Sequence, residues 1–391
     1  MKIQKAYKTQ IYPTIKQQKM LANHFGCVRW IYNHFLQHKS EQYKRTKRSD
    51  DYVQMCAELT KIKKQDDLKW LNDVNRVALN NSIVDLDRAF TNFFRKKSEY
   101  PKFKKKFHKQ SFRLTNQRFS MKERGMETAM MGVIKCSLDG LPEEYKLLSM
   151  TISKEPTGRY FAAISFETDI PNPKIDKSKP IIGLDFGLKT FIATSEGKKI
   201  DHIQSYKQEE KRLKKIDRKL ARQGRGSNRR RATKKRRALL FEKIRNRRSD
   251  FLHKLSRQMV GENQAIYLED LSLKGMQQRW GKKINDLGWR EFSRQLEYKG
   301  KWYGCKIQKI DRFFPSSKMC STCDYINNNL TLSDREWICP SCQTHHDRDV
   351  NAAINVLTYG RAGRNVAEKP KRTGRAGPVR TLQRTVKPRI R

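Results

Sequence analysis

The sequence predicts an α+β protein of several domains, in which a β domain with inserted helices precedes an α/β domain interrupted by clustered cysteines. Three observations lead to this prediction. The chain has 391 residues, enough for two or three domains at ~150 residues each. Strand-like runs alternate with runs whose apolar residues have helical spacing. A stretch with three prolines, 169–180, has the composition of a linker and separates the two parts.

The N-terminal part combines both kinds of pattern. Strand patterns occur at 1–13 and again within 111–168, where KEPTG supplies turn residues between two β runs. Between these segments, apolar residues step by three or four, as from Leu79 to Ile83, which predicts a helical bundle. The simplest arrangement is a β domain of 1–13 and 111–168 with a helical domain, 14–110, inserted into it.

The end of the helical domain mixes cations with aromatic residues. The segment RKKSEYPKFKKKFHK follows Phe94, and its proline stops a helix. We expect it to lie on a phosphate backbone, with Tyr100, Lys102 and Lys104 as candidate nucleic-acid contacts. Burial of the aromatic rings in a core is an equally open alternative.

The second domain is expected at 181–314 and 346–359, and it begins with two or three short β runs separated by glycines. It includes a very basic segment, 207–248, which has 20 Lys or Arg and 4 Asp or Glu. GRGSN breaks this segment, and the sparse apolar positions predict a helical hairpin. A solvated face is the plain interpretation of such a run, but like-charge repulsion favours a bound phosphate backbone. Candidate contacts include Arg229, Arg230 and Arg231.

The whole chain is basic. It has 86 Lys and Arg against 40 Asp and Glu, a net charge of +46. A polyanion is therefore the expected partner, and nucleic acid is favoured over the rival, an anionic membrane surface. The sequence has no run of ~18 apolar residues and no signal-peptide core at its start, so we expect a soluble, cytoplasmic protein. The tail, 360–391, has 11 Lys or Arg and few large apolar residues, and is expected to be disordered.

Four of the eight cysteines form a cluster. Cys320, Cys323, Cys339 and Cys342 have the spacing C-x2-C, fifteen residues, C-x2-C. Two such pairs make a tetrahedral four-sulfur site that suits one Zn²⁺. Because protein ligands fill all four positions, this zinc is expected to be structural. The other cysteines are scattered singly, so a disulfide framework is not expected.

Three separated acids form the second candidate site. Asp185 ends the apolar run IIGLD, Glu269 ends AIYLE, and Asp349 lies in the first turn of a predicted helix. An RNase H-like sheet brings together acids placed in this way. Their hard oxygen ligands suit Mg²⁺, and a pair of ions can activate water and stabilise a leaving oxygen. A metal-dependent nuclease or a strand transferase follows from this pattern.

Two neighbouring acids are expected to have other roles. Asp270 would point away from the site that contains Glu269, because successive strand residues face opposite ways. Asp347 is better placed as the cap of the closing helix. Taken alone, any of the three candidate acids could equally be a turn residue or a cap, and only their joint placement favours a metal site.

Several segments are recognisable together: GLDFGLKTF, YLEDLSLKGM, FFPSSKMCSTCDY, CPSCQTHHDRDVNAAINV and SEYPKFKKKFHKQSFR. In this order and over nearly the whole chain they resemble the transposon-encoded TnpB (OrfB) family, which is ancestral to the type V CRISPR effectors. The resemblance implies a RuvC-like nuclease domain with Asp185, Glu269 and Asp349 as its Mg²⁺ ligands. It also implies a zinc ribbon at 315–345 and an N-terminal β-barrel wedge domain that carries the helical recognition domain.

The resemblance further implies an activity. The family cuts DNA under the direction of a guide RNA made from the transposon end, and the protein itself reads a short target-adjacent motif. We therefore expect a monomeric ribonucleoprotein that acts on double-stranded DNA in the prokaryotic nucleoid. The family's motif-reading helix aligns with 76–94, which makes Arg76, Asn80 and Asn81 candidates for base contacts, with a merely wet helix face as the alternative.

Two points stay open at this level. The family usually has glycine after the second and fourth zinc cysteines, whereas this chain has Asp324 and Gln343, which adopt positive φ less readily. Other functions share the same acids, namely an RNA-guided DNA-binding protein that does not cut and a transposase that joins DNA ends. The retention of all three acids favours the nuclease over the binder.

Overall fold

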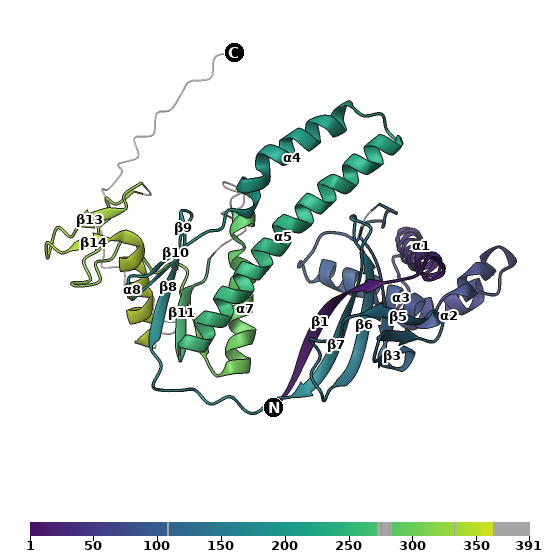
Figure 1. Ribbon diagram of the computed structural model, residues 1–391, viewed down its shortest axis with the longest axis horizontal. Coiled ribbons are helices and arrows are strands. Elements are labelled where there is room, and N and C mark those ends of the chain that lie inside the picture. Colours follow the sequence, from purple (N-terminus) through teal and green to yellow (C-terminus); the bar gives the residue numbers. More distant parts are fainter. Residues whose placement is uncertain (108, 272–274, 276–280, 282–283, 332, 363–391) are drawn as a thin grey trace, which may run out of the picture. The chain divides into compact units, whose positions relative to one another are not determined.

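The computed structural model describes residues 1–107, 109–271, 275, 281, 284–331 and 333–362 (Figure 1). The predicted tail therefore lies outside the described residues from position 363 onward. The chain forms two compact units. The first consists of Met1–Pro173 and Ser205–Ser249, and the second of Lys174–Gln204 and the residues from Asp250 onward. Among the described residues, none of the helices combines the length and the apolar content that crossing a bilayer requires.

A seven-stranded antiparallel sheet forms the β part of the first unit. Its order is β2-β6-β7-β1-β5-β4-β3. The strands are β1 (Lys2–Tyr12), β2 (Gln110–Thr115), β3 (Phe119–Lys122), β4 (Gly125–Thr128), β5 (Gly132–Cys136), β6 (Lys146–Lys154) and β7 (Tyr160–Asp169). A long ladder joins β1 to β7, from Lys2 opposite Asp169 to Ile11 opposite Tyr160. The two distant segments predicted as strands thus lie in one sheet.

The segment between β1 and β2 is helical, as its apolar spacing predicts. It contains α1 (Ile15–Thr46), α2 (Tyr52–Ile62), the 3-10 helix η1 (Asp66–Asp73) and α3 (Arg76–Phe94). Capping boxes begin α1 and α2, because Thr14 and Asp51 each exchange hydrogen bonds with a glutamine three residues on. One continuous core includes apolar residues of these helices and of the sheet, so the inserted helices share their core with the β domain.

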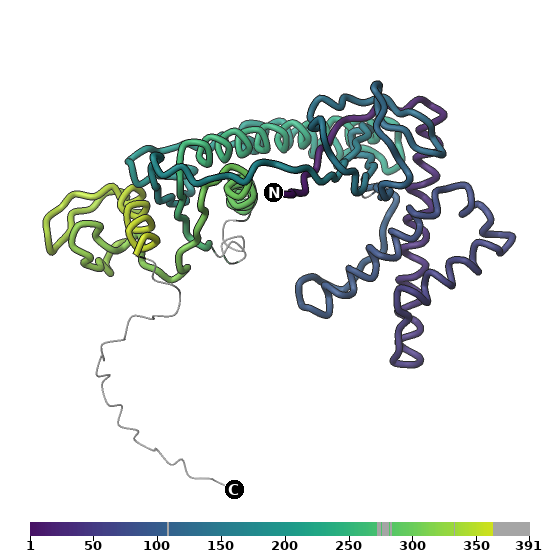
Figure 2. Tube along the Cα trace, turned by 90° about the horizontal axis from the view of Figure 1, so that it is seen from below, coloured from purple at the N-terminus to yellow at the C-terminus, as the bar shows by residue number. Residues whose placement is uncertain are grey.

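The basic segment forms a hairpin of two helices, α4 (Ser205–Arg222) and α5 (Asn228–Glu262), which lie side by side in Figures 1 and 2. The predicted break falls between them, and α5 continues beyond the basic segment to Glu262. Buried Glu209 of α4 pairs with Lys243 at 3.0 Å and Arg247 at 3.4 Å of α5. These pairs relieve part of the repulsion within the hairpin.

The hairpin also differs in its domain assignment from the prediction, which placed 207–248 in the nuclease domain. In the structure Ser205–Ser249 belongs to the first unit. Ion pairs with the turn between β6 and β7 account for this assignment. They join Arg159 to buried Glu242 at 3.2 Å and Glu155 to Arg245 at 3.7 Å.

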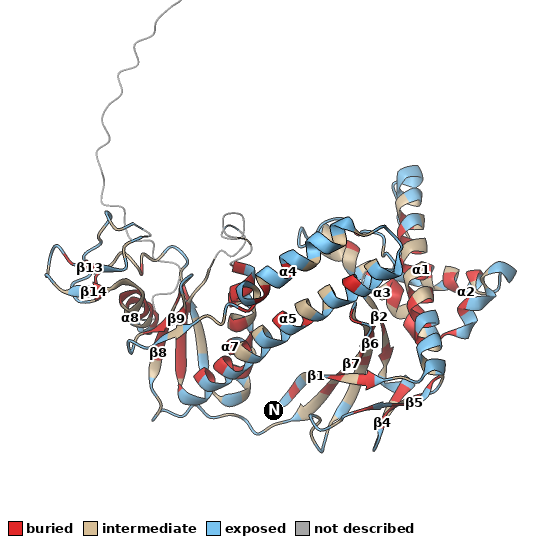
Figure 3. Ribbon diagram, turned by 45° about the horizontal axis from the view of Figure 1, so that its top comes forward, coloured by how far each residue is buried: buried red, intermediate tan, exposed pale blue. Residues whose placement is uncertain are grey.

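The second unit is built on a five-stranded sheet with the order β10-β9-β8-β11-β12. Its strands are β8 (Ile181–Phe186), β9 (Thr190–Thr194), β10 (Lys199–Asp201), β11 (Ala265–Glu269) and β12 (Lys306–Ile310). The strands β8, β11 and β12 are parallel, while β9 and β10 are antiparallel additions at one edge. Buried residues fill the middle of this sheet (Figure 3).

Helices cover both faces of this sheet. Leu184 and Leu268 share a core with the end of α5 and with α7 (Trp289–Tyr303), including Phe292. The alternate residues face the other way, where Tyr267 shares a core with Val356 of α8 (Arg348–Arg361). The short strands β13 (Glu336–Ile338) and β14 (His345–Asp347) form a hairpin that leads directly into α8.

A glycine allows α8 to approach β8 closely. A Cβ placed on Gly183 would lie only 2.1 Å from the carbonyl oxygen of Ala353 and 2.7 Å from the backbone nitrogen of Leu357. Both atoms belong to the backbone of α8, so the contact cannot be relieved by a rotamer change.

We therefore predict that Gly183→Ala displaces α8 from the sheet at a cost of about 1–3 kcal/mol. Hydrogen exchange of the amides in 348–361 should become faster, as mass spectrometry can measure. Gly261→Ala in α5 is the matched control, because a Cβ there meets nothing within 4 Å. Equal exchange of α8 in wild type and Gly183→Ala would contradict the prediction.

Candidate active site and zinc ribbon

Three elements of the second unit bring the predicted acids to one edge of its sheet. Leu184 of β8 pairs with Leu268 of β11 in a parallel ladder, so the next residues, Asp185 and Glu269, follow at the same end. Both acids share the face on which α8 packs, because they alternate with the leucines. Asp349 lies in the first turn of α8.

Asp185 is close enough to Glu269 and Asp349 for both of their charges to act on it. Burial, followed by the charges of Glu269 and Asp349, raises the pKa of Asp185 well above its usual value. Burial also raises the pKa of Glu269. In addition, a Cβ on Gly187 would lie 3.8 Å from Oδ2 of Asp349, which places this carboxylate beside the end of β8. The structure thus brings together all three acids that the sequence analysis selected.

Polar neighbours hold two of these carboxylates. Buried Ser316 donates its hydroxyl hydrogen to Oε1 of Glu269. Arg335 places Nη1 3.6 Å from Oδ1 of Asp349, whose side chain is 15 % exposed. Neither Ser316 nor Arg335 was predicted from the sequence. A serine just before a cysteine pair carries no periodic signal, and its partner is 47 residues away.

The three side chains carry the oxygen donors that a divalent cation prefers. All three residues are half-buried, and a cation bound near them would offset the charges that act on Asp185. The two neighbouring acids that the sequence analysis excluded from the metal site have other roles, as predicted. Asp347 caps α8 by accepting from the backbone N–H groups of Asp349 and Val350, and Asp270 pairs with Arg312.

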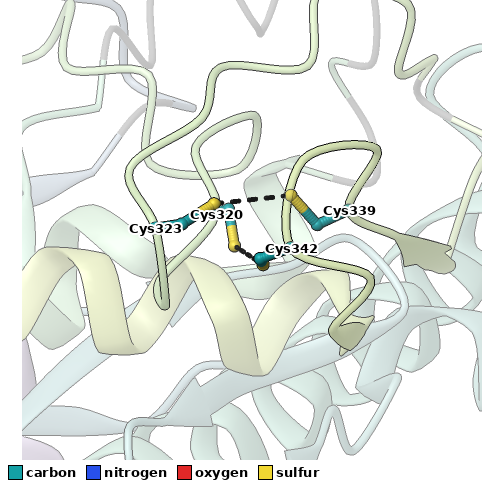
Figure 4. Close-up of side chains that lie close together, drawn as sticks. All are labelled: Cys320, Cys323, Cys339 and Cys342. Carbon is teal, nitrogen blue, oxygen red and sulfur yellow. Dashed lines mark hydrogen bonds between the residues drawn. The ribbon is translucent and has the colours of Figure 1, made fainter.

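The four clustered cysteines converge as well (Figure 4). Their sulfur atoms all lie within 4.8 Å of one another. The separations Cys320–Cys342 and Cys323–Cys339 are both 3.6 Å. Four ligands at ~2.3 Å around a tetrahedral ion would be about 3.8 Å apart, so the cluster fits zinc. Cys320 and Cys339 are fully buried, which suits a structural ion.

Hydrogen-bonding groups surround these sulfurs. His346 places Nε2 3.0 Å from Sγ of Cys320, where its Nε2–H tautomer donates to the sulfur. The hydroxyl of Thr344 lies 3.2 Å from Sγ of Cys342, and its hydrogen bonds lower the pKa of this thiol to about 6. A thiolate is the form that binds metal, so the contacts of Thr344 favour the metal-binding form of Cys342. The sequence analysis did not select either residue.

The two residues that replace the family's glycines keep the turn geometry of the ribbon. Asp324 has φ 58° and Gln343 has φ 59°, both in the left-handed region. Each follows a zinc-site cysteine and donates its backbone N–H to the first cysteine of its pair, Cys320 or Cys339. Both turns therefore form, although a side chain in this region costs roughly 1 kcal/mol relative to glycine.

The candidate base contacts on α3 have different environments. Arg76 is exposed and Asn80 is half-buried, so their predicted role stays a prediction. Asn81 is engaged within the fold: its Nδ2 donates to the carbonyl of Arg113 at 2.9 Å, and its Oδ1 accepts from that residue's guanidinium at 3.3 Å. These contacts account for Asn81 without a ligand, and its base-reading role stays a prediction.

The basic aromatic segment is more structural than predicted. Tyr100 packs edge-on against Phe90 and Phe93, and its hydroxyl lies 2.8 Å from that of Ser40. The ammonium of Lys104 lies 3.8 Å from the centre of the Tyr32 ring. Packing thus accounts for Tyr100 and Lys104 without a ligand, whereas Lys102 is exposed and paired only with neighbouring Glu99.

The three arginines predicted to contact phosphate on the hairpin also have different environments. Arg230 donates to the carbonyls of Leu220 and Gln223 and thereby caps the end of α4, which is a structural role. Arg229 and Arg231 are exposed at the start of α5. They remain candidates for contact with phosphate.

Comparisons with known proteins agree with this architecture. Residues 289–356 match the family described as "Cas12f1-like, TNB domain", residues 163–279 match "Probable transposase", and residues 1–48 match "Helix-turn-helix domain". The chain also resembles a solved Cas12f1-sgRNA-target DNA complex with a TM-score of 0.50 over 91 % of this chain and 99 % of that one. At 14 % identity, this likeness concerns the fold alone.

Two curated relatives cover nearly the whole chain. A Streptomyces pristinaespiralis protein named "Putative RNA-guided DNA endonuclease" is 36 % identical over 98 % of this chain and 97 % of its own length. The Escherichia coli K12 protein "Putative RNA-guided DNA endonuclease InsQ" is 26 % identical over 93 % of this chain and 94 % of its own. With this identity over this length, the chain belongs to the transposon-encoded TnpB (OrfB) family.

Proposed function

We propose that this protein is an RNA-guided DNA endonuclease that cuts DNA by metal-dependent hydrolysis at Asp185, Glu269 and Asp349. The observation that carries the proposal is the convergence of these acids at one sheet edge, where burial and then the charges of Glu269 and Asp349 raise the pKa of Asp185. The names of the relatives that align along the whole chain support the RNA-guided character. Mg²⁺ is the proposed ion because all three ligands are carboxylates.

In this proposal the residues of the site are either metal ligands or neighbours that position those ligands. Asp185, Glu269 and Asp349 would hold the metal, and Ser316 orients the carboxylate of Glu269 by its hydrogen bond. Arg335 keeps a positive charge next to Asp349, at the exposed edge where a phosphate would arrive. Bound Mg²⁺ supplies activation of water and stabilisation of the leaving oxygen. Cleavage by hydrolysis breaks one P–O bond and leaves the water's oxygen on phosphorus.

The basic surface supplies the proposed contacts with nucleic acid. The exposed cations of α4 and α5 carry a large excess of positive charge over a long hairpin, which suits phosphate backbone rather than bases. Sequence would be read by pairing between guide and target, while the protein holds the backbone. Guide RNA from the transposon end and double-stranded DNA are therefore the proposed partners of a monomeric complex.

The test is a cleavage assay on the purified ribonucleoprotein. RNA that co-purifies with the chain is sequenced, and a plasmid library carrying the matching target next to randomised bases is incubated with the complex and Mg²⁺. Linear plasmid, selected for one flanking motif, is expected. Intact but retarded plasmid would instead indicate a binder without cleavage, and joined ends would indicate a transposase.

The serine contact gives a prediction about the metal. Ser316→Ala should raise the Mg²⁺ concentration for half-maximal cleavage about tenfold, because the carboxylate of Glu269 loses its orienting hydrogen bond. Saturating Mg²⁺ should restore most of the rate. The neighbouring variant Ser317→Ala is the control and should behave as wild type. An unchanged Mg²⁺ dependence of Ser316→Ala would show that this contact does not position the ligand.

A further inference from the structure

A cavity of about 550 Å³ lies on α1, in the first unit. It opens between α1 and η1. Its lining includes Gly26, Arg29, Trp30, Asn33, His34 and Trp70. This volume is within the usual range of small-molecule sites, and neither the acids nor the zinc cysteines contribute to it.

Aromatic rings form one wall. Trp30 stacks on His34, with ring centres 4.7 Å apart and planes 13° from parallel. Trp70 meets Trp30 edge-on at 5.6 Å. Trp70 is still 38 % exposed, although its indole N–H already donates to the carbonyl of Asp67. An exposed ring next to other rings is a platform on which a flat heteroaromatic group can stack.

Gly26 is a second, independent observation. It lies inside the 32-residue helix α1, where glycine costs about 1 kcal/mol relative to alanine. Packing does not explain this choice, because a Cβ at Gly26 would meet nothing within 4 Å. The space over the missing side chain belongs to the cavity. A small residue at this position therefore leaves the space to the cavity, whereas a large side chain would fill it.

The rim carries polar groups of both signs. Arg29, Asp73 and the amide of Asn23 line the cavity, together with Gln37, whose amide donates to Glu41 at 2.9 Å. Asn33 exchanges two hydrogen bonds of 2.8 and 2.9 Å with the backbone of Lys104, which fixes the basic segment beside the cavity. A stacking wall, the hydrogen-bonding side chains of Asn23 and Asp73, and the guanidinium of Arg29 together match a nucleotide.

We propose that this cavity binds one unpaired nucleobase, turned out of a nucleic-acid strand and stacked on Trp70, with its edge towards Trp30. The ligand class rests on the proposed function, since the strand is either the guide RNA or the DNA. The bases of RNA and of DNA present the same flat face, so a base of either strand can stack at this site. The cations beside the cavity then hold the phosphates that flank the extruded base.

The test uses the full-length chain freed of co-purified RNA. Single-stranded 12-mers with one central 5-bromouracil, made as RNA and as DNA, are titrated and then cross-linked with light. The cross-link is expected on peptides that contain Trp30 or Trp70. Gly26→Leu should fill the cavity, remove this cross-link and weaken binding about 5- to 100-fold, as loss of one stacked base does.

Matched variants distinguish the effect of filling the cavity from a failure of the protein to fold. Gly26→Ala adds only a methyl group and should bind within about twofold of wild type. Gly261→Leu adds the same side chain to another helical glycine with open space around it, and should leave binding unchanged. If Gly26→Leu does not fold, Trp70→Ala removes the exposed ring and should give the same loss.

The outcomes distinguish this site from the proposed activity. A cross-link with RNA alone or DNA alone supports the site and identifies the source of the base. Wild-type affinity and cross-linking in Gly26→Leu, or cross-links only at other peptides, would overturn the inference even if the protein cuts DNA. Loss of the cross-link in Gly26→Leu, from a protein that cuts nothing, would keep the site and reject the nuclease.

Discussion

Asp185→Asn is expected to reduce guide-directed DNA cleavage at least ~10³-fold while guide RNA remains bound. The substitution keeps the shape of the side chain but removes a charged oxygen ligand, and the metal contribution to such chemistry is worth several kcal/mol. Asp185 interacts with both other carboxylates, because the charge of each raises the pKa of Asp185. Cleavage rates of the purified complex at fixed Mg²⁺, together with the amount of co-purified RNA, measure the two effects.

A control variant and a measurement of stability test the same assignment of Asp185. Asp270→Asn, next to Glu269 but paired with Arg312, should cut as wild type. In metal-free buffer, Asp185→Asn should raise the free energy of unfolding by about 1 kcal/mol, because the substitution removes a charge that Glu269 and Asp349 repel. Cleavage by Asp185→Asn within tenfold of the wild-type rate would remove the three acids from the mechanism.

Cys320→Ser is expected to abolish both the zinc content and the cleavage activity of the chain. A structural zinc supplies ~10–16 kcal/mol to folding in small zinc domains, far more than the contacts of the ribbon's small core can replace. The damage should reach the acidic site, because Asn355 donates to the carbonyls of Ser316 and Met319. Ser316 in turn holds Glu269.

Metal analysis and cleavage assays check this prediction. Wild type should contain one zinc per chain, and prolonged treatment with a zinc chelator should mimic the variant in the presence of excess Mg²⁺. Cys56→Ser is the control, since this half-buried cysteine lies outside the cluster. One zinc per chain and full cleavage in Cys320→Ser would contradict a ligand role for that residue.

Local patterns in the sequence were sufficient to find the main elements. The spacing of Leu79 and Ile83 predicts α3, and the β runs that end at Asp185 and Glu269 predict two strands of one sheet. The convergence of the acids follows from those strands, because parallel neighbours end at the same edge. Even the cap at Asp347 is visible, since capping is decided within one turn.

Contacts between distant residues could not be predicted in this way. Ser316 meets Glu269, and Asn81 meets Arg113, only after the fold brings them together. A sequence window shows that Arg230 is a cation, but not that the carbonyls at the end of α4 use its guanidinium. The assignment of the hairpin to the first unit likewise depends on remote ion pairs such as Arg159 with Glu242.

The stretch from Ser316 to Cys320 limits how the protein can be redesigned. It touches the strand acid at one end, α8 in the middle and the zinc cluster at the other end. A chimera that imports a foreign ribbon should therefore keep these five positions and graft only sequence beyond Cys323. A junction placed at Pro315 would separate the transplanted module from the carboxylate it helps to orient, and would yield a folded but catalytically weak hybrid.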